Sequence, residues 1–409
     1  MKSFYNLLLA SILTLALQGL YAQNNQPIAK VSFGKGISIL APDSSMYLKA
    51  GFRFQTLFES KGDLESDSEW SNSFLVRRAR LKFDGWVHNP NIQYKVELAL
   101  SNRDLSSGAD FSQTSKAPKI ILDAVVKWKV HKYLEIWAGQ TKLPGNRERV
   151  VSSQKLQLVD RSTVNSIFNI DRDQGVHLRS KFKMGKAVVK PIAAISMGEG
   201  RNITTKNIGG FNYTGRLEYL PFGEFKSKGD YFGADLKRED TPKLAIGATY
   251  NINKGASRQT QTGVFLVDDE GNYFENDIQT VFVDAMFKYR GFSVLAEYAD
   301  KRCVLDDNVD HEEVMEKMID ANGNTYYTGS GVSVQAGYLF KKNWEVAGRY
   351  TTVTPDWDRS FRGQKEYTLG LSKYVVGHNL KVQSDITLTD KENKDVHNLR
   401  YRLQFEVAF

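Results

Sequence analysis

The composition of this 409-residue chain is mildly basic and slightly polar, with a formal net charge of +8 and a mean hydropathy of -0.42. Its only long apolar run lies at residues 7–20, so the sequence excludes a bundle of membrane-spanning helices. Its single cysteine, Cys303, excludes an internal disulfide.

The N-terminal region has the pattern of an export signal. Lys2 precedes the apolar run, and the run ends close to Ala22. This predicts a signal peptide over 1–22, because the run is too short and too close to the terminus for a spanning helix. Residues 23–45 are rich in Gly, Asn, Pro and Ser, and we expect a short periplasmic tail without a fold of its own.

Beyond residue 45 the chain alternates apolar and polar side chains with a period of two. The pattern is clearest in 399–409, where every odd position is apolar and the even positions from 400 to 406 are Arg400, Arg402, Gln404 and Glu406. Successive side chains of a strand point to opposite faces, so such a segment has one apolar and one polar face. Tilted strands of about ten residues with this pattern are typical of outer-membrane barrels.

Sixteen segments of this kind can be assigned. They are 46–59, 74–87, 92–100, 119–129, 134–140, 174–182, 187–197, 211–220, 243–251, 280–289, 292–299, 330–339, 344–350, 365–374, 380–388 and 399–409. We therefore predict an all-β fold, a closed antiparallel up-and-down transmembrane β-barrel of 16 strands over 46–409. A soluble β-propeller is the alternative, but it would need a repeated blade motif that the sequence lacks.

The connections between these segments alternate between short and long, as the barrel rule of short periplasmic turns and long external loops requires. One connection, 221–242, is long where a short one is expected. It is either a long periplasmic turn or a missed hairpin.

The polar faces of the first seven strands are mainly basic. A barrel of this size encloses water, so these faces would line a lumen, and rings of Arg and Lys there favour anions. The candidate pore-lining, anion-binding residues are Lys49, Arg53, Arg78, Arg80, Lys82, Lys95, Lys127 and Arg179. We predict an anion-preferring passive channel; the alternative is a general porin whose lumen charges are balanced and solvated.

The longest connection of the first half, about 140–173, mixes basic residues with apolar ones such as Val150, Leu156 and Ile167. A solvated surface loop has little use for these apolar side chains. We expect the loop to fold into the barrel, with its apolar side on the wall; an external loop with a short helix is the alternative.

Four blocks resemble the phosphate-selective porin O and P family. They are VRRARLKFDG at 76–85, GQTKLPGNRE at 139–148, VDRSTVNSIFNIDRDQG at 159–175 and the terminal phenylalanine. The resemblance implies a trimeric, 16-stranded porin whose third external loop folds inward and whose arginine-lysine ladder conducts anions such as phosphate. By motif, Arg78, Arg80 and Lys82 would belong to the ladder, and Arg147, Arg149 and Arg161 to the constriction loop. The second half departs from this pattern, since Glu297, Glu345, Glu366 and Glu406 also face the predicted lumen.

Other functions find little support. The six histidines show no metal-ligand spacing, and no nucleophile elbow or phosphate-cradling glycine loop is present, so we expect neither a cofactor nor a metal nor an enzyme. The basic residues are spread over alternating strands, which argues against nucleic acid. The expected partners are small anions, outer-membrane lipid and lipopolysaccharide, further copies of the chain, and the barrel-assembly machinery acting on the C-terminal strand. A barrel with a structural, adhesive or enzymatic role remains an alternative.

Overall fold

The structure, a computed structural model, describes residues 28–65, 69–101, 119–204, 210–304, 310, 312–314, 318–392 and 397–409. The expected signal peptide, 1–22, lies outside these residues. Strands dominate, and no helix in the described part of the chain is both long and apolar enough to cross a membrane.

Sixteen strands form the barrel, and they follow the predicted order and nearly the predicted bounds. They are β3 (Met46–Asp63), β4 (Ser71–Val87), β5 (Asn89–Ala99), β6 (Ile121–His131), β7 (Leu134–Lys142), β8 (Arg172–Ser180), β10 (Ala187–Ser196), β11 (Asn212–Leu220), β12 (Lys243–Ala256), β13 (Asn276–Tyr289), β14 (Phe292–Cys303), β15 (Gly329–Leu339), β16 (Trp344–Pro355), β17 (Gln364–Val376), β18 (Leu380–Lys391) and β19 (His397–Ala408).

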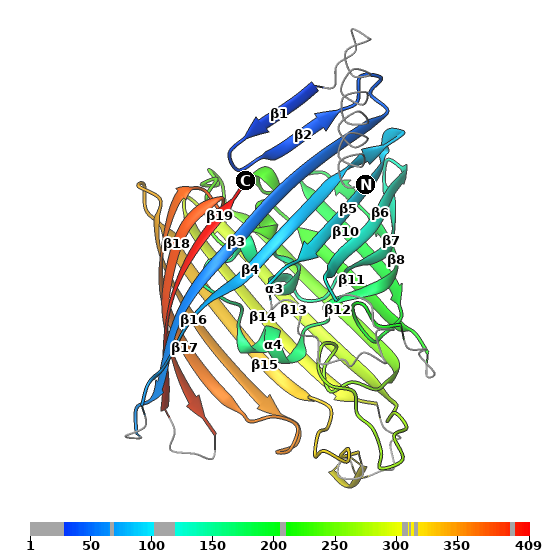
Figure 1. The fold of residues 1–409 in the computed structure, drawn as a ribbon, viewed down its shortest axis with the longest axis vertical. Coiled ribbons are helices and arrows are strands. Elements are labelled where there is room, and N and C mark those ends of the chain that lie inside the picture. The colour runs from blue at the N-terminus through cyan, green and yellow to red at the C-terminus, as the bar shows by residue number, and fades with distance from the viewer. Residues whose placement is uncertain are drawn as a thin grey trace, which may run out of the picture.

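Antiparallel pairing of the last strand with the first closes the sheet. Phe405 of β19 lies opposite Thr56 of β3, and Val407 lies opposite Phe54. The predicted fold class, a closed 16-stranded antiparallel barrel, is therefore confirmed. In Figure 1 the tilted strands surround two short helices, α3 (Arg147–Val150) and α4 (Thr163–Phe168), which lie at mid-height of the barrel.

The period of two places polar side chains inside the barrel and apolar ones outside. On β19, Arg402 and Glu406 are buried, while Tyr401 and Phe405 are exposed on the outer face. Burying charged groups and exposing aromatic ones is the reverse of a soluble protein, and it is the arrangement expected when lipid surrounds the barrel and the lumen is polar.

The connection 221–242 contains no strand. It holds the 3-10 helix η2 (Lys226–Tyr231) and joins β11 directly to β12. Of the two interpretations left open by the sequence, the long turn is correct and the missed hairpin is wrong.

The N-terminal region differs from the prediction. Residues 28–40, expected to have no fold of their own, form a hairpin of β1 (Ile28–Ser32) and β2 (Gly36–Leu40), and β2 pairs with the start of β3. This hairpin projects beyond the end of the barrel at which the C-terminus lies (Figure 1). Its strands have five residues each, about half the length of a spanning strand, so their pattern does not resemble a spanning segment. A third short strand, β9 (Phe182–Met184), extends the β8–β10 hairpin.

Candidate functional site

The predicted basic residues line one side of the lumen, on β3 to β8. Arg53 of β3 donates through its Nη2 to Ser153 Oγ, at 2.7 Å, on a loop inside the barrel. Arg78 of β4 donates through Nη2 to Asp160 Oδ1 on the same loop, at 3.1 Å. These contacts place both guanidinium groups in the lumen and fix the inward face of the two strands. We call the lumen surface of β3 to β8 the basic wall.

The remaining members of the predicted set extend this wall. Arg80 pairs with Glu97 at 3.1 Å, and Lys95 lies 2.9 Å from Asp123. Lys82 is half exposed and lies 3.3 Å from Asp84, the residue opposite Lys49 in the β3–β4 register. Lys127 and Arg179 lie further toward the short-turn end and are described with the inner cavity below.

The connection 143–171 folds into the barrel and covers the other side of the lumen. Ser162 is the N-cap of its helix α4, and the Ser162 Oγ accepts a hydrogen bond from the Asn165 N–H. Val164 and Phe168 then pack in an apolar cluster with wall residues of β13, β14 and β16, namely Phe282, Ala299 and Val353. A Cβ atom at Gly331 would lie 2.9 Å from both α4 side chains, so a residue without a side chain is needed there. We call this connection the lumen loop.

Arg147 of the lumen loop is an anchor and does not face open space. Its side chain is 0% exposed. Its Nε donates to Asp284 Oδ1 at 2.7 Å, and Nη2 lies 3.4 Å from Glu218 Oε1. Arg216 of β11 also donates to Asp284, at 2.6 Å, and to the carbonyl of Gly145, at 2.9 Å. These charge-assisted bonds hold the start of the loop on the wall formed by β11 and β13.

Arg149 and Arg161 lie on the side of the loop that faces the basic wall. Arg149 donates to Asp171 Oδ1 at 2.7 Å, and Arg161 donates to the carbonyls of Glu148, at 2.8 Å, and Val151, at 2.7 Å. Asp160 pairs with Arg77 at 2.7 Å as well as with Arg78. Burial raises the pKa of the Asp160 carboxyl, but these two guanidinium groups outweigh it and hold the pKa well below its ordinary value.

A cavity of about 180 Å³ lies between the basic wall and the lumen loop, toward the long-loop end; we call it the outer basic cavity. Among the described residues of its lining, basic side chains are in large excess over acidic ones, and Asp171 is the one carboxylate. The lining residues are Arg77, Arg78, Arg80, Lys142, Arg149, Ser153, Arg161, Asp171, Arg172, Arg201 and Thr262.

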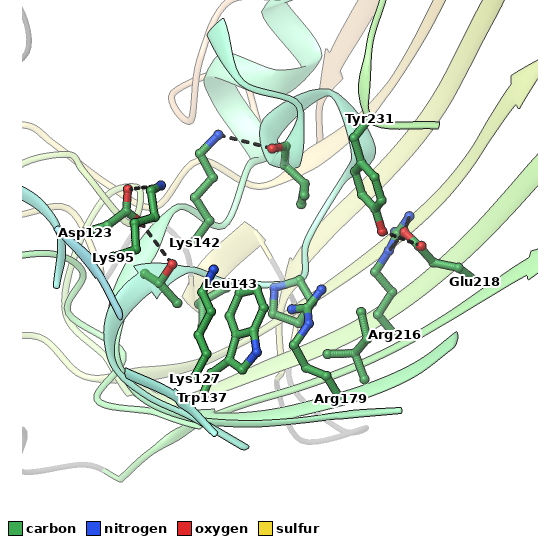
Figure 2. A pocket seen from close by; sticks show the side chains of 14 residues that line it. Lys95, Asp123, Lys127, Trp137, Lys142, Leu143, Arg179, Arg216, Glu218 and Tyr231 are labelled. Carbon is green, nitrogen blue, oxygen red and sulfur yellow. Dashed lines mark hydrogen bonds and ion pairs between the residues drawn. The ribbon is translucent and has the colours of Figure 1, made fainter. Parts of the chain in front are cut away.

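A second cavity of similar volume, about 180 Å³, lies toward the short-turn end (Figure 2); we call it the inner basic cavity. Trp137 lines this cavity and contacts two cations. Lys127 Nζ lies 4.0 Å and Arg179 Cζ 4.3 Å from the centroid of its ring. Lys142 lines both cavities, and its Nζ donates to the carbonyl of Arg149 at 2.6 Å. Lys142 therefore connects the basic residues of the two cavities along the basic wall.

Several of these residues are not predicted from the sequence. Arg77 and its neighbour Arg78 both face inward, which a regular strand does not allow. A bulge in β4 causes this, because Arg77 has no cross-strand residue opposite it between the Gln55–Arg78 and Thr56–Val76 pairs. Trp137 and Arg201 were not considered, although the basic neighbours of Trp137 on paired strands were a usable signal. Within the described part of the chain, no group of three or more His, Cys, Asp or Glu side chains is arranged to hold a metal ion.

A closed barrel with an apolar outer face and a charged lumen narrowed by an inward loop defines an outer-membrane porin. The chain belongs to the phosphate-selective porin O and P family, whose model matches residues 48–409. It is therefore a channel protein of the bacterial outer membrane. A search of curated proteins finds no match.

Solved structures of a porin, a channel and another protein of the outer membrane share the fold at low sequence identity. The anion-selective porin from Comamonas acidovorans is 10% identical with a TM-score of 0.52, covering 88% of this chain and 99% of its own. The outer-membrane channel DcaP of Acinetobacter baumannii is 11% identical with a TM-score of 0.52, covering 93% and 100%. OmpT of Vibrio cholerae, in its trimer form, is 12% identical with a TM-score of 0.52, covering 88% and 99%.

Proposed function

We propose that the protein is a passive diffusion channel that prefers anions, such as phosphate and similar small oxyanions. The observation that carries this proposal is the outer basic cavity, whose lining, among the residues that the structure describes, has eight Arg and Lys side chains and one carboxylate. Low-dielectric walls focus the field of such a cluster, and an oxyanion gains charge-assisted hydrogen bonds from guanidinium groups.

The route for the anion follows the basic wall. A solute enters the outer basic cavity among Arg77, Arg78 and Arg161, passes Lys142, and leaves through the inner basic cavity past Lys127 and Arg179. An opposite charge at about 4 Å contributes ~1 kcal/mol in bulk water and ~4 kcal/mol near a protein surface. Contacts of this size bias permeation without trapping the ion, because several cations of similar strength follow one another.

The wider assembly is also part of the proposal. The family resemblance and the trimer form of Vibrio cholerae OmpT support a homotrimer. With the short turns toward the periplasm, residues 1–22 would act as the export signal and 23–45 would lie on the periplasmic side. Lipid and lipopolysaccharide would surround the barrel, and the barrel-assembly machinery would act on the C-terminal strand.

A general porin with little ion preference is the second candidate, because some cations of the basic wall are paired. Lys95 lies within 3.0 Å of Glu97 and 2.9 Å of Asp123, and Arg172 also pairs with Asp123, at 3.1 Å. Each such pair reduces the local excess of positive charge.

Planar-bilayer recordings under a potassium chloride gradient distinguish the two candidates. The proposed function requires a reversal potential with the same sign as the equilibrium potential of chloride. Phosphate should also reduce the chloride current, because it competes for the basic wall. A reversal potential near zero supports the general porin, and one of the opposite sign excludes the anion channel.

A further inference from the structure

The connection 221–242 turns into the barrel from the short-turn end, where the other connections are tight turns; we call it the inner segment. Asp230 and Ala234 of this segment are buried, although it is a connection at the end of the barrel. A turn that merely joined two strands would leave its backbone in water. The burial requires partners, and the structure shows them on two sides.

The barrel wall is the first partner. The Nζ of Lys288, on β13, donates to three carbonyls of the inner segment: Gly229 at 2.9 Å, Phe232 at 2.8 Å and Ala234 at 2.8 Å. All three N–H groups of a buried ammonium are used, which holds the backbone of the segment in one place.

A second set of bonds holds the return of the segment toward β12. Asp235 accepts a hydrogen bond from the backbone N–H of Gly291 at 2.8 Å, and Arg238 donates to the carbonyl of Leu339 at 2.7 Å. The segment is therefore fastened to the turns after β13 and β15 as well as to Lys288.

The lumen loop is the other partner. The backbone N–H of Gly233 donates to the carbonyl of Lys155 at 2.8 Å, and Arg147 donates to the carbonyl of Asp230 at 3.1 Å. The Nζ of Lys155 lies 3.7 Å from the centroid of the Phe232 ring. Two segments that enter from opposite ends of the barrel thus meet inside it.

The inner segment also reaches the solute path. Tyr231 borders the inner basic cavity, and its hydroxyl donates to Glu218 Oε2 at 2.6 Å (Figure 2). Its ring lies 5.2 Å from Lys190 Nζ and 5.7 Å from the Arg147 guanidinium carbon. The width of this cavity therefore depends on where the inner segment is held.

We propose that the inner segment is a second constriction element of the channel. It closes the side of the lumen beneath the lumen loop, holds that loop in place through Gly233, and confines solutes to the basic wall, where Tyr231 limits the size of what can pass. The inference rests on the pore of the proposed function and does not require its preference for anions.

The first test adds a side chain at the contact between the inner segment and the lumen loop. A Cβ atom at Gly233 would lie 2.8 Å from the backbone nitrogen of Gln157, so Gly233→Val should push the inner segment and the lumen loop apart. The matched control is Gly215→Val, because a Cβ atom there meets nothing within 4 Å. We expect Gly233→Val to raise single-channel conductance about twofold or more, since conductance follows the open cross-section of a water-filled pore. Gly215→Val should conduct like the wild type.

A second pair of variants removes the lysine anchor. Lys288→Met deletes the three bonds to the inner segment, whereas Lys301→Met removes another buried lumen-facing lysine, on β14. Both variants lose one positive charge, so any difference between them comes from the segment. Lys288→Met should increase conductance and admit larger neutral polyethylene glycols in liposome swelling, and Lys301→Met should admit none that the wild type excludes.

Both experiments use the full chain, with heat-modifiable migration on gels as the check of barrel folding. Folded Gly233→Val and Lys288→Met channels with wild-type conductance and wild-type size exclusion would overturn the proposal. The reversal potential in the same membranes tests the anion preference separately. A channel without anion preference whose conductance rises in the two variants would contradict only the proposed function. An anion-preferring channel whose conductance does not change would contradict only the second constriction.

Discussion

The lumen wall from β3 to β8 and the wall from β11 to β18 follow the same alternation of inward and outward side chains, but they differ in what covers them. The first wall borders two cavities, and many of its inward groups are cations. The second packs against the lumen loop through Phe282, Ala299 and Val353, and its carboxylates Asp284 and Glu297 bond to loop residues. The comparison teaches that the alternation decides which side chains point inward, whereas the lumen loop decides which of them a solute can meet.

Charge reversal on the open wall should have the largest effect. Replacing Arg78 and Arg80 with Glu puts two negative charges beside the outer basic cavity and should lower the chloride-to-potassium permeability ratio about tenfold, or ~1.4 kcal/mol, which would reverse a modest preference. Reversal potentials measure this. Lys365→Glu is the control, since that side chain is exposed on β17 beside the inward Glu366. Equal shifts in the two proteins would show that the lumen assignment of β4 is wrong.

Weakening the contact between the lumen loop and the wall from β11 to β18 should have the second-largest effect. Phe168 is fully buried against the wall and lies edge-on to Phe361 with ring centroids 5.7 Å apart. Phe168→Ala removes about 3–5 kcal/mol from loop docking, so we expect frequent current fluctuations and a larger mean conductance. Phe405→Ala, on the outer face, should leave the open-channel current steady. A Phe168→Ala channel without added current fluctuations would mean that this apolar cluster does not hold the lumen loop.

The contact between the basic wall and the lumen loop should have a smaller effect. Asp160→Asn removes the carboxylate that faces Arg77 and Arg78 and should raise the anion preference by roughly two- to threefold, equivalent to under ~1 kcal/mol. Asp269→Asn, in an exposed loop, should not change it.

The effect of Asp160 should also be insensitive to acid. Because its folded-state pKa is lowered, the stability from its ion pairs is present above the ordinary value of 3.8 and is lost only as the pH falls through the lower pKa. The difference between wild type and Asp160→Asn should therefore be the same at neutral pH and near pH 4. A difference that disappears on mild acidification would contradict this account of the contact.

The smallest expected effect concerns Trp137. Its ring contacts Lys127 and Arg179, and each contact contributes ~0.5–2 kcal/mol to holding a cation in place. Trp137→Leu should weaken the block of chloride current by phosphate about two- to threefold. Trp128→Leu is the control, because Trp128 is exposed on the outer face of the preceding strand. If Trp128→Leu has the larger effect, the ring of Trp137 does not order the cations.

The strands and their inward faces could be predicted because the signal is local: a period of two within about ten residues is enough. The contacts of each arginine in the lumen loop could not be predicted. Arg147 looks like Arg149 in the sequence, yet its partners Asp284 and Glu218 are brought to it only by barrel closure. Arg77 was missed because a bulge shifts the alternation by one residue. The hairpin at 28–40 was missed because its strands are too short to resemble spanning segments.

The pairing of β19 with β3 has a consequence for how the molecule forms. The seam that completes the cylinder joins β19 to β3, the last and the first of the sixteen barrel strands, which lie at opposite edges of the sheet until this pairing forms. A chain that lost its final strand would keep two unpaired edges, and such edges invite pairing with other chains.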